Sequence, residues 1–593
     1  MSFVDWLVVA LFLACVVGIG LWFTKRASKS MDDYFVAGRT IPWWLAGTSM
    51  LATSFASDTP LHTTRMIREH GLGGAWFYWG GILNGVVIAF VFSRLWRRTG
   101  VVTDNEFLEL RYTGKRAAYL RGGLAVFKCV FLEILTMAWI TLGMTKIVRT
   151  IMGLPDSLSI GGTAVPSEIV VVAVLLVLTL TFSVAAGFWG VVTTDLVEFA
   201  VAMIGAVILC FVAIDKVGGI AGLRVGLEKS SLAGHAFDLT PTIGKGAGDA
   251  AVEGLSVLSF GVFLGVQWWA HAGVDASGQR AQRLLACKDE KNAIAASVWS
   301  LAVQWIIRSW PWYVAALASL VLYPNLPDHE TAYPRMVADL LPVGVKGLMV
   351  ASFVSAFMAT IEAHYNLTAS YLMNDVYRRF VAKDRDNTHY VKASRWMTLG
   401  VAITAGGVTL MLPSVLGAFR FKMELMAGLG LVFLLRWFWW RISATSEIVA
   451  LVASITMTLV LNKLPATAGG GAHGSSLRLL LVVGVSSAAA ITATLLTAPE
   501  PEAHLVKFYE RVRPPGWWGP IAEKAGAEAR TPLFGARTFV QMGVTLVFVF
   551  ACMIGLGKLI LGETAVGVAL LVIGAAAGTV TIRSVLGKTA TLE

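Results

Sequence analysis

The chain has 593 residues, of which 56% are hydrophobic and 14% are charged. A soluble globular domain of this size does not have such a composition, so the sequence indicates a multi-pass protein of a lipid bilayer. The net charge of +11 does not indicate a nucleic-acid partner, because the basic residues are spread over short loops between apolar runs. The five cysteines lack CxxC spacing, so neither a disulfide framework nor a transition-metal site is indicated.

Apolar runs long enough to cross a hydrocarbon core of about 30 Å predict about fifteen transmembrane helices. Their centres lie near residues 13, 50, 83, 135, 176, 203, 262, 312, 360, 403, 430, 453, 487, 548 and 573. The first run lacks the basic region and cleavage site of a signal peptide, so we expect an uncleaved spanning helix. If every run crosses once, the basic clusters, which include Arg94–Arg98, Arg280–Lys291 and Arg436–Arg441, share one side. The positive-inside rule makes that side cytoplasmic, with the N-terminus outside and the C-terminus inside.

The second run, residues 43–70, is polar at its centre, where it reads TSFASDTP. Pro60 has no amide hydrogen and disfavours helical geometry at Thr59, so the carbonyl groups before it lose their donors. In secondary transporters such freed carbonyls at membrane depth coordinate cations. The alternative is a simple proline kink.

Ionisable residues inside later runs predict a polar interior, because such groups are costly at membrane depth and face a bundle interior or a wet cavity. They are Glu133, Asp195, Glu198 and Arg308. Asp195 and Glu198 share a helix face. We expect Arg308 to form a structural ion pair with a carboxylate.

The seventh run is also interrupted, at Gly265, Gln267, Gly273, Asp275 and Gly278. Runs two and seven are five helices apart, which is the spacing that two inverted five-helix repeats require. The paired interruptions therefore favour an inverted repeat.

The ninth run, around residues 347–379, carries polar residues where a lipid-facing helix would have leucine or valine: Glu362, His364 and Asn366. Small residues at helical spacing give it one face that another backbone can approach: Ala356, Ala359 and Thr360. The alternative is ordinary interhelical hydrogen bonding and small-residue packing.

The two long connections are residues 216–250, expected outside, and 499–535, expected inside. The second contains PPGWWGP, which predicts an interfacial element anchored by Trp517 and Trp518. Walker and nucleotide-binding motifs are absent from the loops, so we expect transport driven by gradients and no enzyme activity.

Several stretches, in order, resemble the sodium/solute symporter family, which includes bacterial sodium/proline and sodium/galactose carriers. They are SMDDYFVAGRTIPWWLAGTSMLATSFAS from residue 30, GVVTTDLVEF around Asp195, AQRLLACKDE at 281–290, and GLMVASFVSAFMATIEAHYN with NDVYRR within 347–379. The resemblance covers about residues 1–465.

The resemblance implies an all-α membrane fold of the leucine-transporter type, with an inverted five-plus-five helix repeat. One extra helix precedes this core and about four follow it. Residues 1–40 then form the N-terminal helix and a cytoplasmic link, and residues 41–443 form the core. Its repeats span about 41–215 and 250–443. Residues 444–593 form the extra helices, with the cytoplasmic loop 499–535.

The resemblance also implies a sodium site between the broken first core helix and the eighth. By position, its ligands are Ala52, Phe55, Ala356, Ala359 and Thr360. Ala359 departs from the family pattern, which has a hydroxyl group there. Asp195 matches a second cation site of some members, and Glu362 stands where that site has a hydroxyl group. Because hard cations prefer oxygen, this pair can serve a second cation; alternatively, the two carboxylates can share a proton.

The family's solute pocket maps onto three stretches of the core. Its residues here are Ser54, Asp58 and Thr59, then Trp76 and Tyr78, then Gln267, Trp268 and Trp269. Apolar walls with a few polar groups suit a small organic solute, and tryptophan suits a sugar-like or an amine- or amino-acid-like one.

We therefore expect a secondary active transporter of a bacterial inner membrane that imports a small polar solute by sodium-coupled symport with alternating access. It needs no organic cofactor. Alternatives are proton-coupled symport of the same solutes and a transport-fold receptor that acts through a partner. A membrane enzyme using Asp195, Glu362 and His364 would require these groups to converge.

Overall fold

The computed structural model describes residues 1–27, 37–54, 56–101, 104–182, 188–230, 232–239, 257–383, 385, 387–464, 471–526 and 534–587. In these residues the regular structure is helical apart from one antiparallel hairpin, in which Ser157 pairs with Pro166. Each predicted run centre lies in a helix. The all-α fold class is confirmed.

The first part of the chain contains α1 (Phe3–Ala27), η1 (Ala37–Arg39), α3 (Trp43–Ala52), α4 (Thr59–His70), η2 (Leu72–Ala75), α5 (Trp76–Trp79), α6 (Gly81–Val87), η3 (Ile88–Phe92), α7 (Ser93–Thr99), α8 (Glu106–Arg111), α9 (Gly114–Phe127), η4 (Lys128–Glu133), α10 (Ile134–Met152), β1 (Ser157–Ile160), β2 (Thr163–Pro166), α11 (Ser167–Phe182) and α12 (Phe188–Lys216).

The middle part contains α13 (Gly219–Leu227), α14 (Val257–Val262), η5 (Phe263–Gln267), α15 (Gln279–Ala286), α16 (Glu290–Ala302), η6 (Val303–Arg308), α17 (Ser309–Leu322), η7 (His329–Thr331), α18 (Ala332–Leu340), α19 (Val345–Ser370), η8 (Tyr371–Val381), α20 (Asn387–Thr409), α21 (Val415–Ala427) and α22 (Gly430–Phe438). The last part contains α23 (Ala444–Leu461), α24 (Gly471–Leu496), α25 (Glu502–Val512), α26 (Gly519–Ala522), α27 (Ala536–Ile560) and α28 (Thr564–Leu586).

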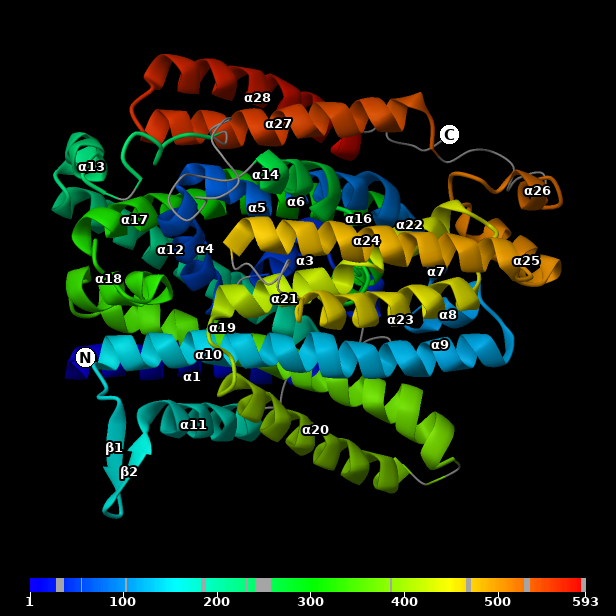
Figure 1. Ribbon diagram of the computed structural model, residues 1–593, viewed down its shortest axis with the longest axis horizontal. Coiled ribbons are helices and arrows are strands. Elements are labelled where there is room, and N and C mark those ends of the chain that lie inside the picture. Colours follow the sequence, from blue (N-terminus) through cyan, green and yellow to red (C-terminus); the bar gives the residue numbers. More distant parts are fainter. Residues whose placement is uncertain are drawn as a thin grey trace.

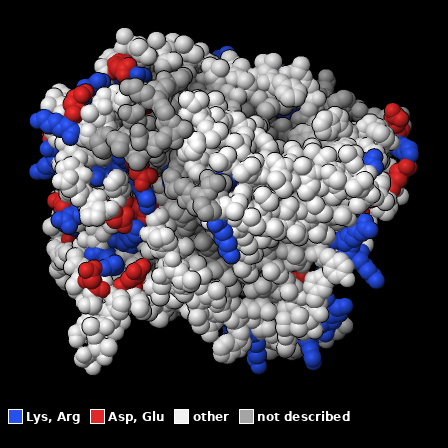
Figure 2. Space-filling view, viewed as in Figure 1, with Lys and Arg blue, Asp and Glu red and all other residues white. Residues whose placement is uncertain are grey.

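Nine helices of the described residues are long and apolar enough to cross a membrane, and three shorter apolar helices accompany them. The long helices run roughly parallel, with the N-terminus at one end of the bundle and the C-terminus at the other (Figure 1). On the face drawn in Figure 2, charged side chains gather at those two ends, and the band between them is almost uncharged. This distribution matches the apolar core and polar faces of a bilayer.

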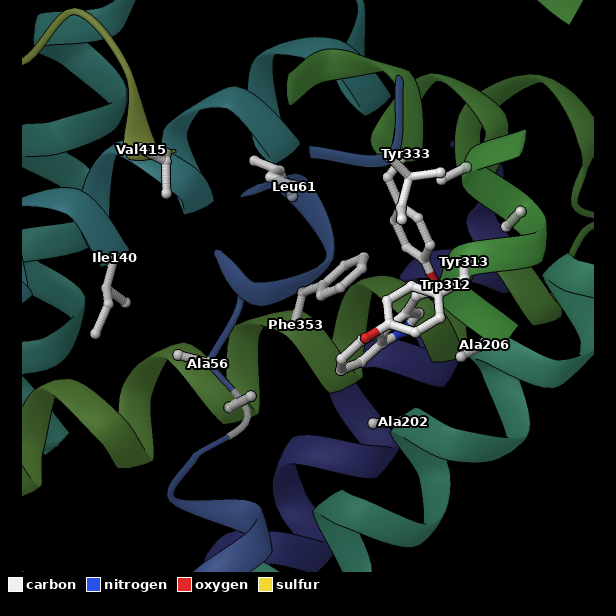
Figure 3. Packing of buried hydrophobic residues seen from close by; sticks show 14 of the residues in the cluster. Ala56, Leu61, Ile140, Ala202, Ala206, Trp312, Tyr313, Tyr333, Phe353 and Val415 are labelled. Carbon is white, nitrogen blue, oxygen red and sulfur yellow. The ribbon is translucent and has the colours of Figure 1, made fainter. Parts of the chain in front are cut away.

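The predicted interruption of the second run is present, because α3 ends at Ala52 and α4 begins at Thr59. Pro60 occupies the first turn of α4, where its missing N–H costs nothing. Figure 3 shows Ala56 on the non-helical link between the two helices, in the same buried cluster as Phe353 of α19. The polar centre of this run is therefore a true break.

The seventh run is also broken, between Gln267 at the end of η5 and Gln279 at the start of α15. Ala276 and Gly278 have φ values of 68° and 82° within this link. Asp275 in the link is fully buried and accepts hydrogen bonds from Arg436 at 2.5 Å and from the Trp437 indole at 2.7 Å. A buried charge pair thus holds the second break in place.

The structure corrects two interpretations of polar and aromatic residues. Arg283 and Arg436, grouped with the loop charges, are each only 3% exposed and contact buried carboxylates. Trp518, expected to be a membrane anchor beside Trp517, is 1% exposed and donates to the carbonyl oxygen of Trp437 at 2.7 Å. Trp517 is 66% exposed, as an interfacial residue would be.

Candidate functional site

A small cavity of about 20 Å³ lies where the end of α3 meets α12, α15 and α19. That volume has room for about one water molecule or one monatomic ion. The residues around the cavity are Ala52, Thr53, Asp195, Glu198, Phe199, Gln279, Arg283, Ala356, Thr360 and Ala363.

The cavity brings together several residues that the sequence predicts as cation ligands. Ala52 comes from the end of α3, whereas Ala356 and Thr360 lie one turn apart on α19. Phe55 lies outside the described residues, and Ala359 lies in α19 without a described side chain. The helix break and the small face of α19 are therefore neighbours.

Two carboxylates of α12 complete the polar wall of this cavity. Ser49 donates to Asp195 Oδ2 at 2.6 Å, and Ser355 donates to Glu198 Oε1 at 2.6 Å. The charges of Asp195 and Glu362 both act on Glu198. Carboxylate, hydroxyl and carbonyl oxygens are the ligands that hard cations prefer.

Arg283 of α15 places a positive charge at the same cavity. Its Nε atom donates to Ser49 Oγ at 3.2 Å, and its Nη2 atom lies 4.0 Å from Asp195 Oδ2. Because Ser49 bonds to both residues, the serine, the aspartate and the arginine form one connected group. The cavity thus combines negative and positive groups within a few ångströms.

Arg308 reaches the end of α3 from the opposite part of the chain. Its Nη1 atom donates to the Leu51 carbonyl oxygen at 3.3 Å and to Ser54 Oγ at 2.8 Å, and its Nη2 atom donates to the Ser54 carbonyl oxygen at 3.1 Å. We expected a carboxylate partner, and Asp58 does act on the guanidinium electrostatically. The hydrogen bonds, however, go to the carbonyl groups that the break sets free.

Asp58 centres a second group of buried residues at the start of α4. The Trp139 indole donates to its Oδ2 atom at 3.0 Å, and His62 Nε2 lies 3.9 Å from the same oxygen. The other oxygen, Oδ1, is buried without a hydrogen-bond partner among the described residues. Tyr78 joins this group through a 2.6 Å hydrogen bond between its hydroxyl group and His62 Nδ1.

Lys422 of α21 approaches the Asp58 group from the other side of Trp139. Its ammonium nitrogen lies 4.9 Å from the centre of the Trp139 ring and donates to Thr136 Oγ1 at 2.7 Å. A lysine inside an apolar run is visible in the sequence, and the rule that singled out Glu133 also applies to Lys422. Trp139 gives no such signal, because tryptophan is common in apolar runs.

The other predicted solute contacts do not all converge on Asp58. Gln267 donates to the Phe77 carbonyl oxygen at 3.0 Å and lines a separate cavity of about 10 Å³. The Trp76 indole donates to the Leu239 carbonyl oxygen, and the Trp269 indole donates to that of Gly265. Thr59 begins α4 beside Asp58, and Trp268 follows η5. Both cavities are far smaller than the 300–1,000 Å³ or so of a pocket for an organic ligand, so these residues are drawn in a contracted state.

His364 contacts Glu133 of η4 through its Nδ1 atom, so this histidine links α19 to the α9–α10 helix. Asp195 has its own partners, Ser49 and Arg283. The hydrogen bonds of the two groups do not connect them, and the arrangement does not favour the enzyme hypothesis.

The end of the bundle that holds the N-terminus is joined by Glu330, whose side chain is fully buried. Its carboxylate accepts hydrogen bonds from Lys146 at 2.6 Å and from the backbone N–H groups of Val415 and Leu416 at 3.0 and 2.9 Å. Arg65 of α4 lies 3.4 Å away. One carboxylate thus ties α4, α10 and the start of α21 together.

Comparison with known proteins places this geometry in a family. The profile of the sodium:solute symporter family matches residues 34–455. The sodium/glucose cotransporter of Vibrio parahaemolyticus is 26% identical over 494 residues, which cover 78% of this chain and 86% of that protein. Sodium/glucose cotransporter 4 of Danio rerio is 24% identical over 583 residues, which cover 89% and 83%.

A solved structure has the same fold. It is the substrate-bound, outward-open state of a Na⁺-coupled sialic acid symporter, which matches with a TM-score of 0.64 at 22% identity. The match covers 84% of this chain and 99% of that one. The expected fold of the leucine-transporter type is confirmed, whereas the exact number of repeat helices stays a prediction.

Proposed function

We propose, from the premise that this chain belongs to the sodium:solute symporter family, that it imports a small polar organic solute together with sodium across a bacterial inner membrane. The observation that carries the proposal is the cavity of about 20 Å³ between the broken end of α3 and the small face of α19. Unwound backbone facing a packed helix at membrane depth is the usual construction of a cation site in secondary transporters.

In this proposal the carbonyl groups of Ala52, Phe55 and Ala356 bind sodium together with the hydroxyl group of Thr360. Ala359 contributes no hydroxyl group, so the site has fewer oxygen ligands than the family pattern. Nearby carboxylates compensate with negative charge, because a hard cation is held by oxygen and by charge. Asp195 and Glu362 are the proposed members of a second cation or proton site.

We assign the solute to the Asp58 group. The buried Oδ1 atom of Asp58 lacks a partner among the described residues, and a buried acceptor without a donor costs free energy. A solute hydroxyl or ammonium group would satisfy it, which fits a sugar-like or an amine- or amino-acid-like molecule. Both cotransporters compared above are named for glucose, which favours the hydroxyl-rich class.

Coupling follows from differential binding. A cation that binds only where the end of α3 meets α19 stabilises the arrangement in which those elements touch, and it thereby raises the affinity of any solute that needs the same arrangement. The link between α3 and α4 carries both Ala52 and Asp58, so it connects the proposed cation and solute sites directly.

Proton coupling is the second candidate, and a specific observation favours it. Asp195 and Glu362 both act on Glu198, so three carboxylates lie close enough to repel one another. Neighbouring carboxylates relieve such repulsion by sharing a proton. A proton at this group would then take the place of the second cation.

Transport into proteoliposomes tests both candidates. Purified protein is reconstituted, and uptake of labelled sugars, polyols, amines and amino acids is measured under an inward sodium gradient, an inward proton gradient, or neither. We expect one solute class to accumulate under the sodium gradient and to leave when a sodium ionophore is added. Accumulation under the proton gradient alone would replace sodium by protons, and a rate indifferent to both gradients would refute symport.

A further inference from the structure

Arg308 occupies an unusual place for a buried arginine. It ends η6, is 5% exposed, and its guanidinium contacts the last turn of α3 and the link that follows. Trp312, one turn along the same helix, packs its ring 5.0 Å from the guanidinium carbon. The ring contact and the hydrogen bonds together fix the direction of the arginine side chain.

The acceptors of Arg308 flank the residues that line the cavity. Leu51 and Ser54 give their carbonyl oxygens to the guanidinium, and the two residues between them, Ala52 and Thr53, line the cavity of about 20 Å³. The last carbonyl groups of a helix lack donors within that helix. In a membrane interior, where water is scarce, they need a donor from another element.

An arginine suits this task better than a lysine. The guanidinium is a rigid, planar group with five N–H donors, so it can hold two carbonyl groups at a fixed separation. The local backbone contributes one further bond, from the Ser54 N–H to the Leu51 carbonyl oxygen at 3.0 Å. The segment 51–54 is thus held at both ends and from outside its own helix.

We propose that Arg308 is a positioning residue for the transported cation: it fixes the backbone of residues 51–54 so that Ala52 faces the cavity and its carbonyl group can bind sodium. The inference rests on the proposed sodium coupling. It differs from it in assigning the shape of the cation site to a residue that does not touch the ion.

The chain contains a matched control for this role. Arg68 of α4 is also buried, and it donates to the Ser319 carbonyl oxygen at 2.6 Å, to Ser319 Oγ at 3.0 Å and to the Tyr323 carbonyl oxygen at 2.8 Å. Its acceptors are therefore of the same kinds as those of Arg308. They lie on α17 and just beyond it, away from the residues that line the cavity.

The test is a sodium titration of thermal unfolding in detergent at constant ionic strength, with choline chloride replacing sodium chloride. A cation that binds only the folded protein raises the unfolding temperature in a saturable way. We expect Arg308→Gln to raise the half-saturating sodium concentration by about tenfold, the factor that a lost hydrogen bond to a charged group accounts for. Arg68→Gln should lower the unfolding temperature and leave half-saturation within about twofold of the wild type.

Arg308→Lys keeps the charge but cannot span both carbonyl groups, so its half-saturation should fall between the wild type and Arg308→Gln. It also carries the test if Arg308→Gln does not fold. Half-saturation that is unchanged in the Arg308 variants, or raised equally by Arg68→Gln, would overturn the positioning role and leave sodium coupling intact. A wild-type protein with no sodium-dependent shift would instead overturn the proposed coupling, and the inference with it.

Discussion

Among the residues expected to bind the cation, Thr360 is the one whose side chain carries an oxygen atom; the others are alanines and a phenylalanine. It lines the cavity together with Ala356 from the previous turn. Backbone carbonyl groups are held by the fold and survive substitution. The side-chain contribution to sodium binding should therefore depend strongly on this one hydroxyl group.

We predict that Thr360→Ala weakens sodium binding by about tenfold, which corresponds to losing about 1.4 kcal/mol. Thr368→Ala is the matched control, since Thr368 lies two turns along α19 and donates to the His364 carbonyl oxygen of its own helix at 2.6 Å. Sodium titration followed by intrinsic tryptophan fluorescence measures both variants. Equal sodium affinity in the two would remove Thr360 from the site.

The polar positions of the site are largely predictable from the sequence, because a charge inside an apolar run is costly and therefore has a reason to be there. Asp195, Glu198, Glu362 and Arg308 all stand out in this way. Their partners do not. Arg283 lies among basic loop residues in the sequence, and only the fold of α15 brings its side chain to Asp195 and Ser49.

At the scale of elements, both helix breaks are held by a buried arginine from a distant helix. Arg308 of η6 binds the carbonyl groups at the end of α3, and Arg436 of α22 binds Asp275 in the link before α15. The breaks themselves were predictable, because Pro60 and a series of glycines interrupt the apolar pattern. Which arginine supports which break was not, since that depends on how helices far apart in the chain pack.

The end that holds the N-terminus depends on Glu330, which joins helices that must separate if a solute is to enter there. Lys146 and Arg65 supply positive charge, and the first N–H groups of α21 supply donors. A carboxylate at a helix N-terminus is favoured by the unpaired N–H groups and by the helix dipole. Sequence analysis did not single out Glu330, because it lies in a connection where charged residues are common.

We predict that Glu330→Gln destabilises this closure by about 3–5 kcal/mol, the usual result of removing one partner from a buried ion pair. Hydrogen exchange should then speed up at the Val415 and Leu416 amides, which Glu330 accepts from directly. The control is Glu69→Gln, since Glu69 also pairs with Arg65, at 2.6 Å, but is partly exposed. Exchange at residues 415 and 416 that is the same in both variants would contradict the role of Glu330.

At the scale of the whole molecule, the charges decide how the bundle sits in the membrane. The hairpin β1–β2 lies at the end that holds the N-terminus, and α25 and α26 lie at the end that holds the C-terminus (Figure 1). Lys507 and Arg511 of α25 belong to the basic connections that the positive-inside rule assigns to the cytoplasm. If that rule holds here, the end that Glu330 closes faces outward, and the structure is closed to solute from outside.

This orientation predicts opposite labelling of two exposed positions. Ser159→Cys, in the hairpin, should react with a membrane-impermeant maleimide in intact spheroplasts, whereas Lys524→Cys, just after α26, should react only after lysis. The unsubstituted protein measures background from the native cysteines, of which Cys15 is exposed. The reverse labelling would turn the bundle over, and Glu330 would then close the cytoplasmic end. Import would require sodium to enter from the opposite end of the α3–α19 cavity, so the labelling result fixes which end must open first.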